Sequence, residues 1–329
     1  MRTLLLFRPY AGYPNVKYRP SLSFHSIAPA LGDARIVRPG KWRPARCLGW
    51  ILILVFGVVL TFGPATEAIS HALPSRPAYY FLAKALGALI VLCAYALLVW
   101  VGEGRKPSEL ALAAAPIGIL GGLFVGGVMF AAVGAILVGA GLYDMEYHGP
   151  VAAWQAGGLA LESSVLEEVL VRGVILRLVW RGFGPVPAFV ASGVLFGVGH
   201  IANPGATLFT TTCVAIEAGV MLGAFYALTG RLWVSIGVHA GWNFTQGYLF
   251  GARVSGGDFG DSVATSIARR HLPDLLTGGA FGPEASVAAL VVCTPVGAGV
   301  LWLAWRTGRF SEPLSRQGDV EARGAKLAR

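Results

Sequence analysis

The chain consists largely of long apolar runs that are separated by short polar or glycine- and proline-containing segments. A run of about 18 or more apolar residues is long enough to cross a membrane as a helix. The pattern predicts eight such helices, at 47–63, 79–101, 116–142, 153–176, 186–202, 207–229, 232–250 and 284–305. The period-two alternation typical of a membrane β-barrel is missing from these runs. We therefore predict an all-α fold, a polytopic membrane bundle of about eight transmembrane helices.

Composition supports this prediction and excludes other classes of protein. Of the 329 residues, 55% are hydrophobic and only 13% are charged, whereas a soluble domain carries about 25% charged residues. The net charge of +9 lies in the two ends of the chain. Residues 1–46 contain nine Lys and Arg against one acid, and residues 306–329 contain six against three. Such ends attract anionic lipid and set membrane orientation, so we do not expect a nucleic-acid partner.

The sequence divides into a basic Pro/Arg-rich tail (1–46), a transmembrane domain (47–306) and a second basic tail (307–329). With the N-terminus inside, twenty Lys and Arg lie in cytoplasmic segments, including 177–185, and four lie in outer loops. This imbalance predicts that both termini are cytoplasmic. The short loops favour a bacterial cell (inner) membrane.

Span four contains charged residues that are costly in lipid and usually functional. It carries Glu167, Glu168 and Arg172. Glu168 and Arg172 are four residues apart and share one helix face, so Arg172 can neutralise Glu168. Glu167 points about 100° away and has no cation in its own helix. The pair on its own could be structural, but Glu167 would then be an unpaired carboxylate in lipid.

Two other spans place polar groups at a similar depth. Span five ends at His200, one turn after Phe196, and span seven carries His239 and Asn243 four residues apart. A single histidine in a membrane helix is often only a packing residue. Acid and base groups on three helices at one depth instead indicate a common site. Glu162 and Glu217 could line the same cavity, and we expect secondary roles for both.

These motifs resemble those of the CAAX-protease and bacteriocin-processing (CPBP, or Abi) family of intramembrane endopeptidases. The matching patterns are Glu167-Glu168-x-x-x-Arg172, Phe196-x-x-x-His200 and His239-x-x-x-Asn243, in this order, within about 155–250. The first pattern alone is weak, and the ordered set of three is specific.

The resemblance implies hydrolysis of a peptide bond in a membrane-associated protein or peptide. Glu167 would activate water, and His200, His239 and Asn243 would support the tetrahedral intermediate. A carboxylate in a low-dielectric cavity is a better base than one in water. Glu168, Arg172 and Phe196 would hold this set in position.

A metal-dependent mechanism is the alternative, with a divalent ion such as zinc on Glu167, His200 and His239. The HExxH motif is missing, and no partner carboxylate for either histidine is evident from the sequence. We therefore expect no cofactor.

Other functions remain open at this point. A proton- or ion-coupled transporter also uses intramembrane Glu, His and Arg, but its inverted repeats would place polar groups in both halves of the chain. A catalytically idle immunity or scaffold protein would not need every motif residue. The rhomboid and presenilin motifs are incomplete here. The sequence does not identify the substrate.

Overall fold

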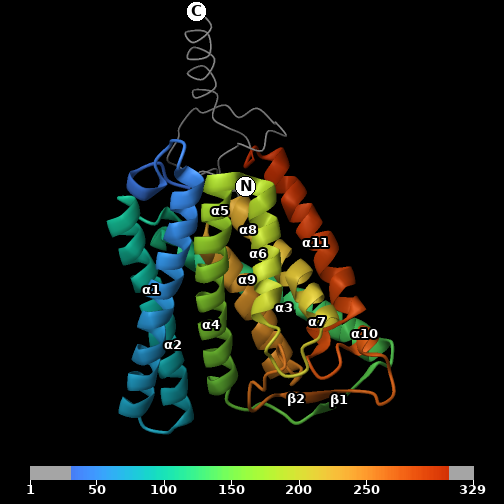
Figure 1. Cartoon of the computed structure of the whole chain (residues 1–329). Coiled ribbons are helices and arrows are strands. Elements are labelled where there is room, and N and C mark those ends of the chain that lie inside the picture. Colours follow the sequence, from blue (N-terminus) through green and yellow to red (C-terminus); the bar gives the residue numbers. More distant parts are fainter. Residues whose placement is uncertain (1–30, 311–329) are drawn as a thin grey trace, which may run out of the picture.

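The computed structural model describes residues 31–310 and is mostly helical. Five helical stretches are long and apolar enough to cross a membrane. They are α1 (Arg43–Ala72), α2 (Pro77–Glu103), Leu112–Gly139 with α3 (Ala115–Gly139), Leu208–Thr229 and α11 (Val287–Arg306). Together with the family match reported below, they make the chain a multi-pass membrane protein. Figure 1 shows these helices running roughly side by side as a bundle.

Of the eight predicted spans, the fourth, fifth and seventh are also helical but do not meet the same length and composition, whereas the sixth meets them as a composite helix. The fourth forms one rod of α4 (Trp154–Glu168), the π-helical segment η5 (Val169–Leu176) and α5 (Arg177–Phe183). The fifth is the short α6 (Pro185–Gly199). The sixth, within Leu208–Thr229, comprises α7 (Leu208–Val214), η6 (Ala215–Leu222) and α8 (Gly223–Thr229). The seventh comprises α9 (Leu232–Phe244) and η7 (Thr245–Leu249). Charges in the fourth span, the shortness of the fifth and polar residues such as His239, Asn243 and Gln246 in the seventh explain why five helices, not eight, qualify.

Two short strands qualify the all-α prediction. β1 (Tyr143–Tyr147) pairs antiparallel with β2 (Ala264–Ala268), with Tyr143 opposite Ala268. Figure 1 shows them at the end of the bundle away from N and C, near the short helix α10 (Asp274–Thr277). Their segments lie between predicted spans, where hydrophobic periodicity gave no strand signal.

Glycines allow α3 and α9 to pack with their backbones in close contact. A Cβ atom on Gly126 would lie 1.9 Å from the carbonyl oxygen of Val238, and one on Gly241 would lie 2.3 Å from that of Leu123. Small residues are a common means of close helix packing in membranes. Because α9 carries His239 and Asn243, this contact helps to fix the position of both side chains.

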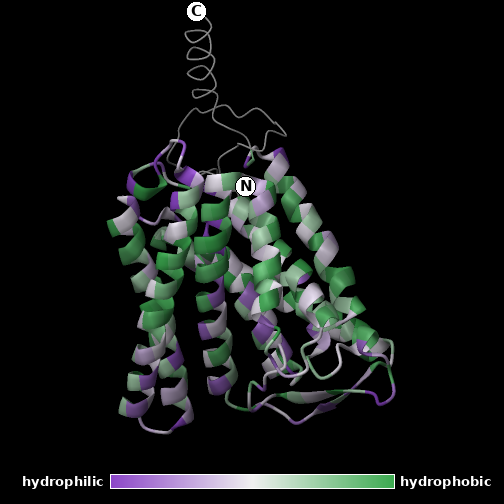
Figure 2. Ribbon diagram, in the orientation of Figure 1, coloured by the Kyte–Doolittle hydropathy of each residue, from purple (hydrophilic) through white to green (hydrophobic). Residues whose placement is uncertain are grey.

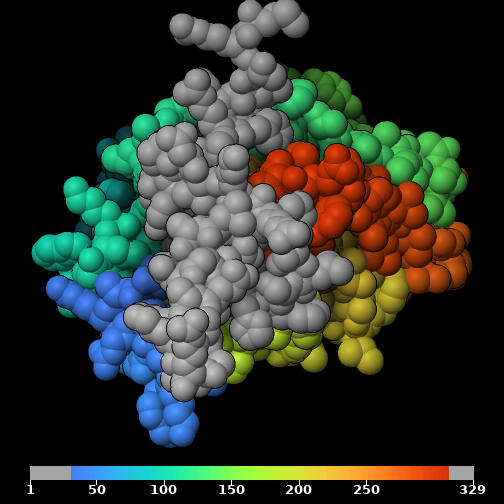
Figure 3. Space-filling view, turned by 90° about the horizontal axis from the view of Figure 1, so that it is seen from above, coloured from blue at the N-terminus to red at the C-terminus, as the bar shows by residue number. Residues whose placement is uncertain are grey.

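The surface of the bundle is apolar along most of its length. Figure 2 shows hydrophobic residues over the long helices, and hydrophilic residues mainly at helix ends, in connecting segments and at a few interior positions. Seen from above, the first helices and the end of α11 lie on different sides of the molecule (Figure 3). The distribution of hydrophobic residues along the long helices suits a protein surrounded by lipid.

A buried ion-pair network joins α2, α5 and the 3₁₀ turn η3 (Ser108–Leu110). Arg177 donates to both oxygens of Glu103, at 2.8 and 2.6 Å, and Arg105 donates to both oxygens of Glu109, each at 2.8 Å. Arg177 is fully buried, and Arg181 is almost so. The sequence predicts both arginines in a cytoplasmic loop, and the structure instead places them in α5. They can be buried there because acids on other segments neutralise their charges, Glu103 for Arg177 and Asp33 for Arg181.

Part of the predicted N-terminal tail also belongs to the bundle. α1 begins at Arg43, and Leu31 and Val37 are buried against the helices. Arg46 donates a hydrogen bond of 2.9 Å to the carbonyl oxygen of Ile36. Of the second predicted tail, 307–329, the residues from 311 onward lie outside the described part of the chain.

Glu109 gives this network a predictable dependence on pH. Burial alone would raise its pKa, but the charges and hydrogen bonds of Arg105, the charge of Arg177 and the Tyr95 hydroxyl lower the pKa to about 2 from the usual 4.5. The ionised form therefore stabilises the fold above pH 4.5, and this contribution disappears as the pH falls through about 2.

We predict that Glu109→Gln lowers the melting temperature in detergent by several degrees at pH 7. The difference from wild type should shrink steadily between pH 4.5 and pH 2, because the wild-type carboxylate then becomes neutral as well. Glu146→Gln, on the exposed face of β1, is the control and should change little. A difference that is independent of pH would show that the charge of Glu109 does not stabilise the fold.

Candidate active site

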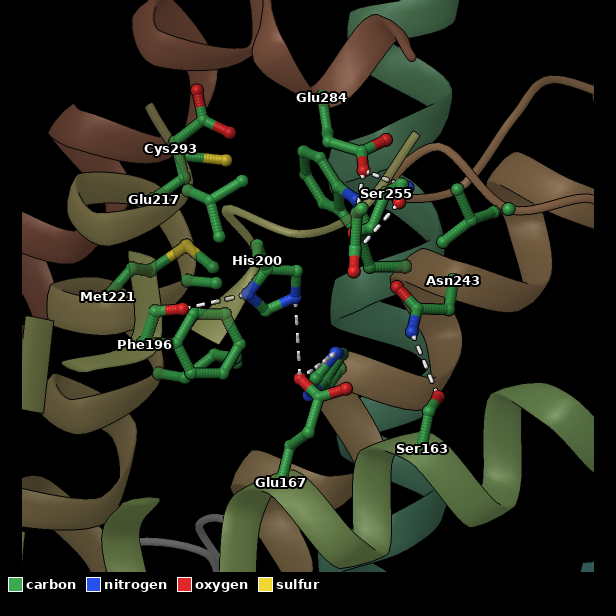
Figure 4. A pocket seen from close by; sticks show the side chains of 18 of the residues that line it. Ser163, Glu167, Phe196, His200, Glu217, Met221, Asn243, Ser255, Glu284 and Cys293 are labelled. Carbon is green, nitrogen blue, oxygen red and sulfur yellow. Dashed lines mark hydrogen bonds and ion pairs between the residues drawn. The ribbon is translucent and has the colours of Figure 1, made fainter. Parts of the chain in front are cut away.

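The three sequence motifs meet at one point inside the bundle. The Oε2 atom of Glu167, on α4, lies 3.9 Å from Nε2 of His200 and 3.9 Å from Nε2 of His239. His200 directly follows α6, and His239 lies on α9. Figure 4 shows Glu167 pointing into a cavity toward His200. The structure therefore brings together the acid and both histidines that the sequence singled out.

Glu168 does not line the cavity and instead links two side chains. Its Oε1 atom accepts hydrogen bonds from Arg172, at 2.7 Å, and from Nδ1 of His239, at 3.0 Å. The side chains of Glu168 and Arg172 are completely buried. The predicted pair of Glu168 and Arg172 is thus present, and it also holds the imidazole of His239.

Arg172 and Phe196 support the other histidine. Arg172 also donates to the carbonyl oxygen of Ala218, and its guanidinium carbon lies 4.8 Å from the centre of the Phe196 ring. The Phe196 ring also packs against both imidazoles, with its centre 4.9 Å from that of His200 and 6.0 Å from that of His239. The Phe196 ring therefore packs against the fixed cation of Arg172 as well as against the imidazole of His200.

Hydrogen bonds at Nδ1 determine what the two imidazoles present to Glu167. Nδ1 of His200 lies 2.8 Å from the carbonyl oxygen of Phe196, which can only accept. Nδ1 of His239 faces the carboxylate of Glu168. Each neutral ring therefore carries its proton on Nδ1 and directs an Nε2 lone pair at Glu167. Two lone pairs facing one carboxylate oxygen require a shared proton or a bridging donor between them.

The cavity in front of these groups has a volume of about 300 Å³. Asn243 lines it and is held by Ser163, whose hydroxyl lies 3.4 Å from the amide nitrogen. In the described part of the chain, Asn243 forms no direct hydrogen bond with Glu167 or with the two histidines of the site. The structure thus places all four predicted catalytic residues on the wall of one cavity.

The cavity wall also contains three residues outside the predicted catalytic set. The sequence predicts a secondary role for Glu217 and no role for Glu284 or Ser255. Glu217, from η6, and Glu284 and Ser255, from the segments between α9 and α11, all line the cavity. No sequence motif marks the last two, which become neighbours only through the fold. Glu162 instead pairs with Lys84 at 2.6 Å, across the contact between α4 and α2, and does not line the cavity.

The geometry bears on the metal alternative in two ways. No partner carboxylate for either histidine is evident from the sequence, but the structure provides one for His239, because Glu168 holds its Nδ1. The separations, however, do not fit a tetrahedral ion. With bonds of about 2.1 Å, ligand atoms lie about 3.4 Å apart, whereas Glu167 lies 3.9 Å from each nitrogen. Within residues 31–310, no three His, Cys, Asp or Glu side chains are arranged to hold a metal ion.

Residues 149–245 match the family model described as type II CAAX prenyl endopeptidase, Rce1-like. This segment is similar to the CAAX proteases. The match confirms the resemblance drawn from the three motifs, and the Rce1-like segment contains all of Glu167, His200, His239 and Asn243. It covers under a third of the chain. No curated protein and no solved structure matches the sequence.

The two adjacent glutamates should differ in their effect on stability. Glu168→Gln leaves Arg172 as a buried charge without its carboxylate and weakens the hold on His239, so we predict a loss of about 3 to 5 kcal/mol. Glu167→Gln should leave the melting temperature in detergent nearly unchanged, since Glu167 has no cation to lose. Equal melting temperatures for the two variants would contradict these assignments.

Proposed function

We propose that the protein is an intramembrane endopeptidase that cleaves a membrane-associated protein or peptide with a water molecule activated by Glu167. The observation that carries this proposal is the distance of 3.9 Å from Oε2 of Glu167 to Nε2 of both His200 and His239. These distances are too long for direct hydrogen bonds. They suit a water that is bound to the carboxylate and to a histidine at once.

Simple geometry supports this role. A water with hydrogen bonds of about 2.8 Å to each of two atoms 3.9 Å apart makes an angle of about 90° between them, close to its natural value. Glu167 accepts one proton of this water, and His200 accepts the other hydrogen bond at Nε2. The water oxygen then attacks the carbonyl carbon of the peptide. Glu167 next delivers its proton to the leaving amine, so that one carboxylate acts first as base and then as acid.

The negative oxygen of the tetrahedral intermediate needs donors. Asn243 supplies its amide from the cavity wall, and its bond of 3.4 Å to Ser163 is weak enough to exchange. His239 can donate from Nε2 when both ring nitrogens are protonated, and Glu168 then accepts the hydrogen bond from its Nδ1. One such donor is typically worth about 10²–10³ in rate.

This mechanism involves no metal ion. The wide spacing of Glu167, His200 and His239 supports that choice, and no step above depends on an ion. We further propose that the basic ends of the chain associate with anionic lipid, and that the protein lies in a bacterial cell membrane with eight spans.

The first prediction from this mechanism concerns cleavage. Glu167→Gln should abolish it, with a loss of at least about 10³-fold expected when an acid–base group is removed, while the protein remains folded. The measurement is a comparison of new protein N-termini in membranes that contain the wild type or the variant. Glu146→Gln is the matched control. N-termini that persist in the Glu167→Gln membranes would contradict the role of this residue as the base.

A second prediction concerns metal dependence. Prolonged dialysis of the purified protein against strong chelators should leave its peptidase activity intact, because the mechanism needs only Glu167, His200, His239 and Asn243. A loss of activity that zinc restores would overturn the metal-free mechanism without changing the proposed reaction.

A third prediction concerns membrane orientation. Reporter proteins fused after residue 329 and within 256–265 should report opposite sides, with the first in the cytoplasm. The reason is the excess of Lys and Arg on one set of connecting segments. If both fusions report the same side, the proposed orientation is wrong.

A further inference from the structure

Two buried acids on the cavity wall have no role in the proposed mechanism. Glu217 is 3% exposed and Glu284 is 5% exposed, and both line the same cavity as Glu167. They approach it from different elements, Glu217 from η6 and Glu284 from the 3₁₀ turn η8 (Pro283–Ala285). Figure 4 shows both beside the cavity, across from Glu167.

The other buried glutamates in the described part of the chain are paired with a basic residue. Glu103 and Glu109 are paired with Arg177 and Arg105, Glu162 with Lys84, and Glu168 with Arg172. Glu217 and Glu284 form no ion pair with any residue between 31 and 310. The carboxyl group of Glu217 also accepts no hydrogen bond from these residues, and its Oε1 atom is buried without a partner.

Glu284 is held in place but is only half satisfied. Its Oε1 atom accepts hydrogen bonds from the backbone N–H of Ser255 and from the Ser255 hydroxyl, the latter at 2.9 Å. Its Oε2 atom is buried and has no hydrogen-bond partner. The carboxyl group is therefore oriented, while half of its accepting capacity is unused.

A buried carboxylate without a partner is unfavourable by several kcal/mol. A group of this kind either keeps its proton or binds a cation from outside. Because both acids line the cavity that would receive the peptide, the substrate is the natural source of the cation. Val214 and Met221, which also line the cavity, offer apolar contact to the methylene groups of a long basic side chain.

We propose that Glu217 and Glu284 form a subsite for a lysine or arginine side chain of the substrate, adjoining the bond that is cleaved. This inference rests on the proposed function. It assigns Glu217 and Glu284 a role in substrate selection, separate from the chemistry at Glu167.

The test uses the full-length protein in detergent and proteome-derived peptides that were cut after glutamate, so that lysine and arginine remain internal. Sequencing of the products should show enrichment of basic residues at one position near the cleaved bond. A synthetic peptide with lysine at that position should then be cleaved about tenfold more efficiently than its norleucine counterpart, as expected for a charged hydrogen bond.

The variants locate this preference. Glu217→Gln and Glu284→Gln should each reduce it strongly while still cleaving the norleucine peptide, and Glu146→Gln should retain it. No preference for lysine in the wild type, or a preference that survives in both variants, would overturn the proposal.

A second measurement does not depend on catalysis. The peptide acetyl-Leu-Lys-Leu-amide should raise the melting temperature of Glu167→Gln more than its norleucine counterpart does, and Glu217→Gln should remove the difference. If no peptide is cleaved but this difference is seen, the proposed protease function fails and the subsite remains. If calcium, magnesium or zinc chloride instead raises the melting temperature of the wild type but not that of Glu217→Gln, the occupant is a metal ion and the subsite proposal is wrong.

Discussion

The carboxylate of Glu168 is the constraint on which the candidate site depends. One of its oxygens accepts hydrogen bonds from Arg172 and from Nδ1 of His239, so a single buried group joins α4 to α9 and fixes the orientation of an imidazole. Because that nitrogen is occupied, His239 can present only Nε2 to the cavity. Glu167, one position earlier on the same rod, then faces this Nε2 and that of His200. The adjacent acids thus have separate tasks, since a helix directs consecutive side chains about 100° apart.

The packing around this centre makes the arrangement rigid. Glycines let α3 and α9 approach so closely that a methyl group at Gly126 would overlap the backbone of α9. On the other side, the Phe196 ring packs against both Arg172 and His200. In a surrounding of low dielectric, charges and hydrogen bonds held in this way act more strongly than they would in water. A bundle with many apolar residues on its surface can therefore place polar groups where hydrolysis would need them.

Local features of the site could be predicted from the sequence, and contacts between distant segments could not. The pairing of Glu168 with Arg172 follows from their spacing on one helix, and all eight apolar runs are helical. The bond from His239 to Glu168 spans 71 residues and depends on how α4 and α9 pack. The burial of Arg177 was missed for the same reason, because its partner Glu103 lies 74 residues earlier. Glu284 carries no motif and reaches the cavity only through the fold.

The tautomers of the two histidines provide the most direct test of this account. Nitrogen NMR of the protein labelled at histidine, with signals assigned by His200→Gln and His239→Gln, reports which ring nitrogen carries the proton. The account predicts a proton on Nδ1 in the neutral form of both rings. It also predicts that Glu168→Gln alters His239 while His200 keeps its tautomer. A proton on Nε2 of both neutral rings would contradict the account, because no lone pair would then face Glu167.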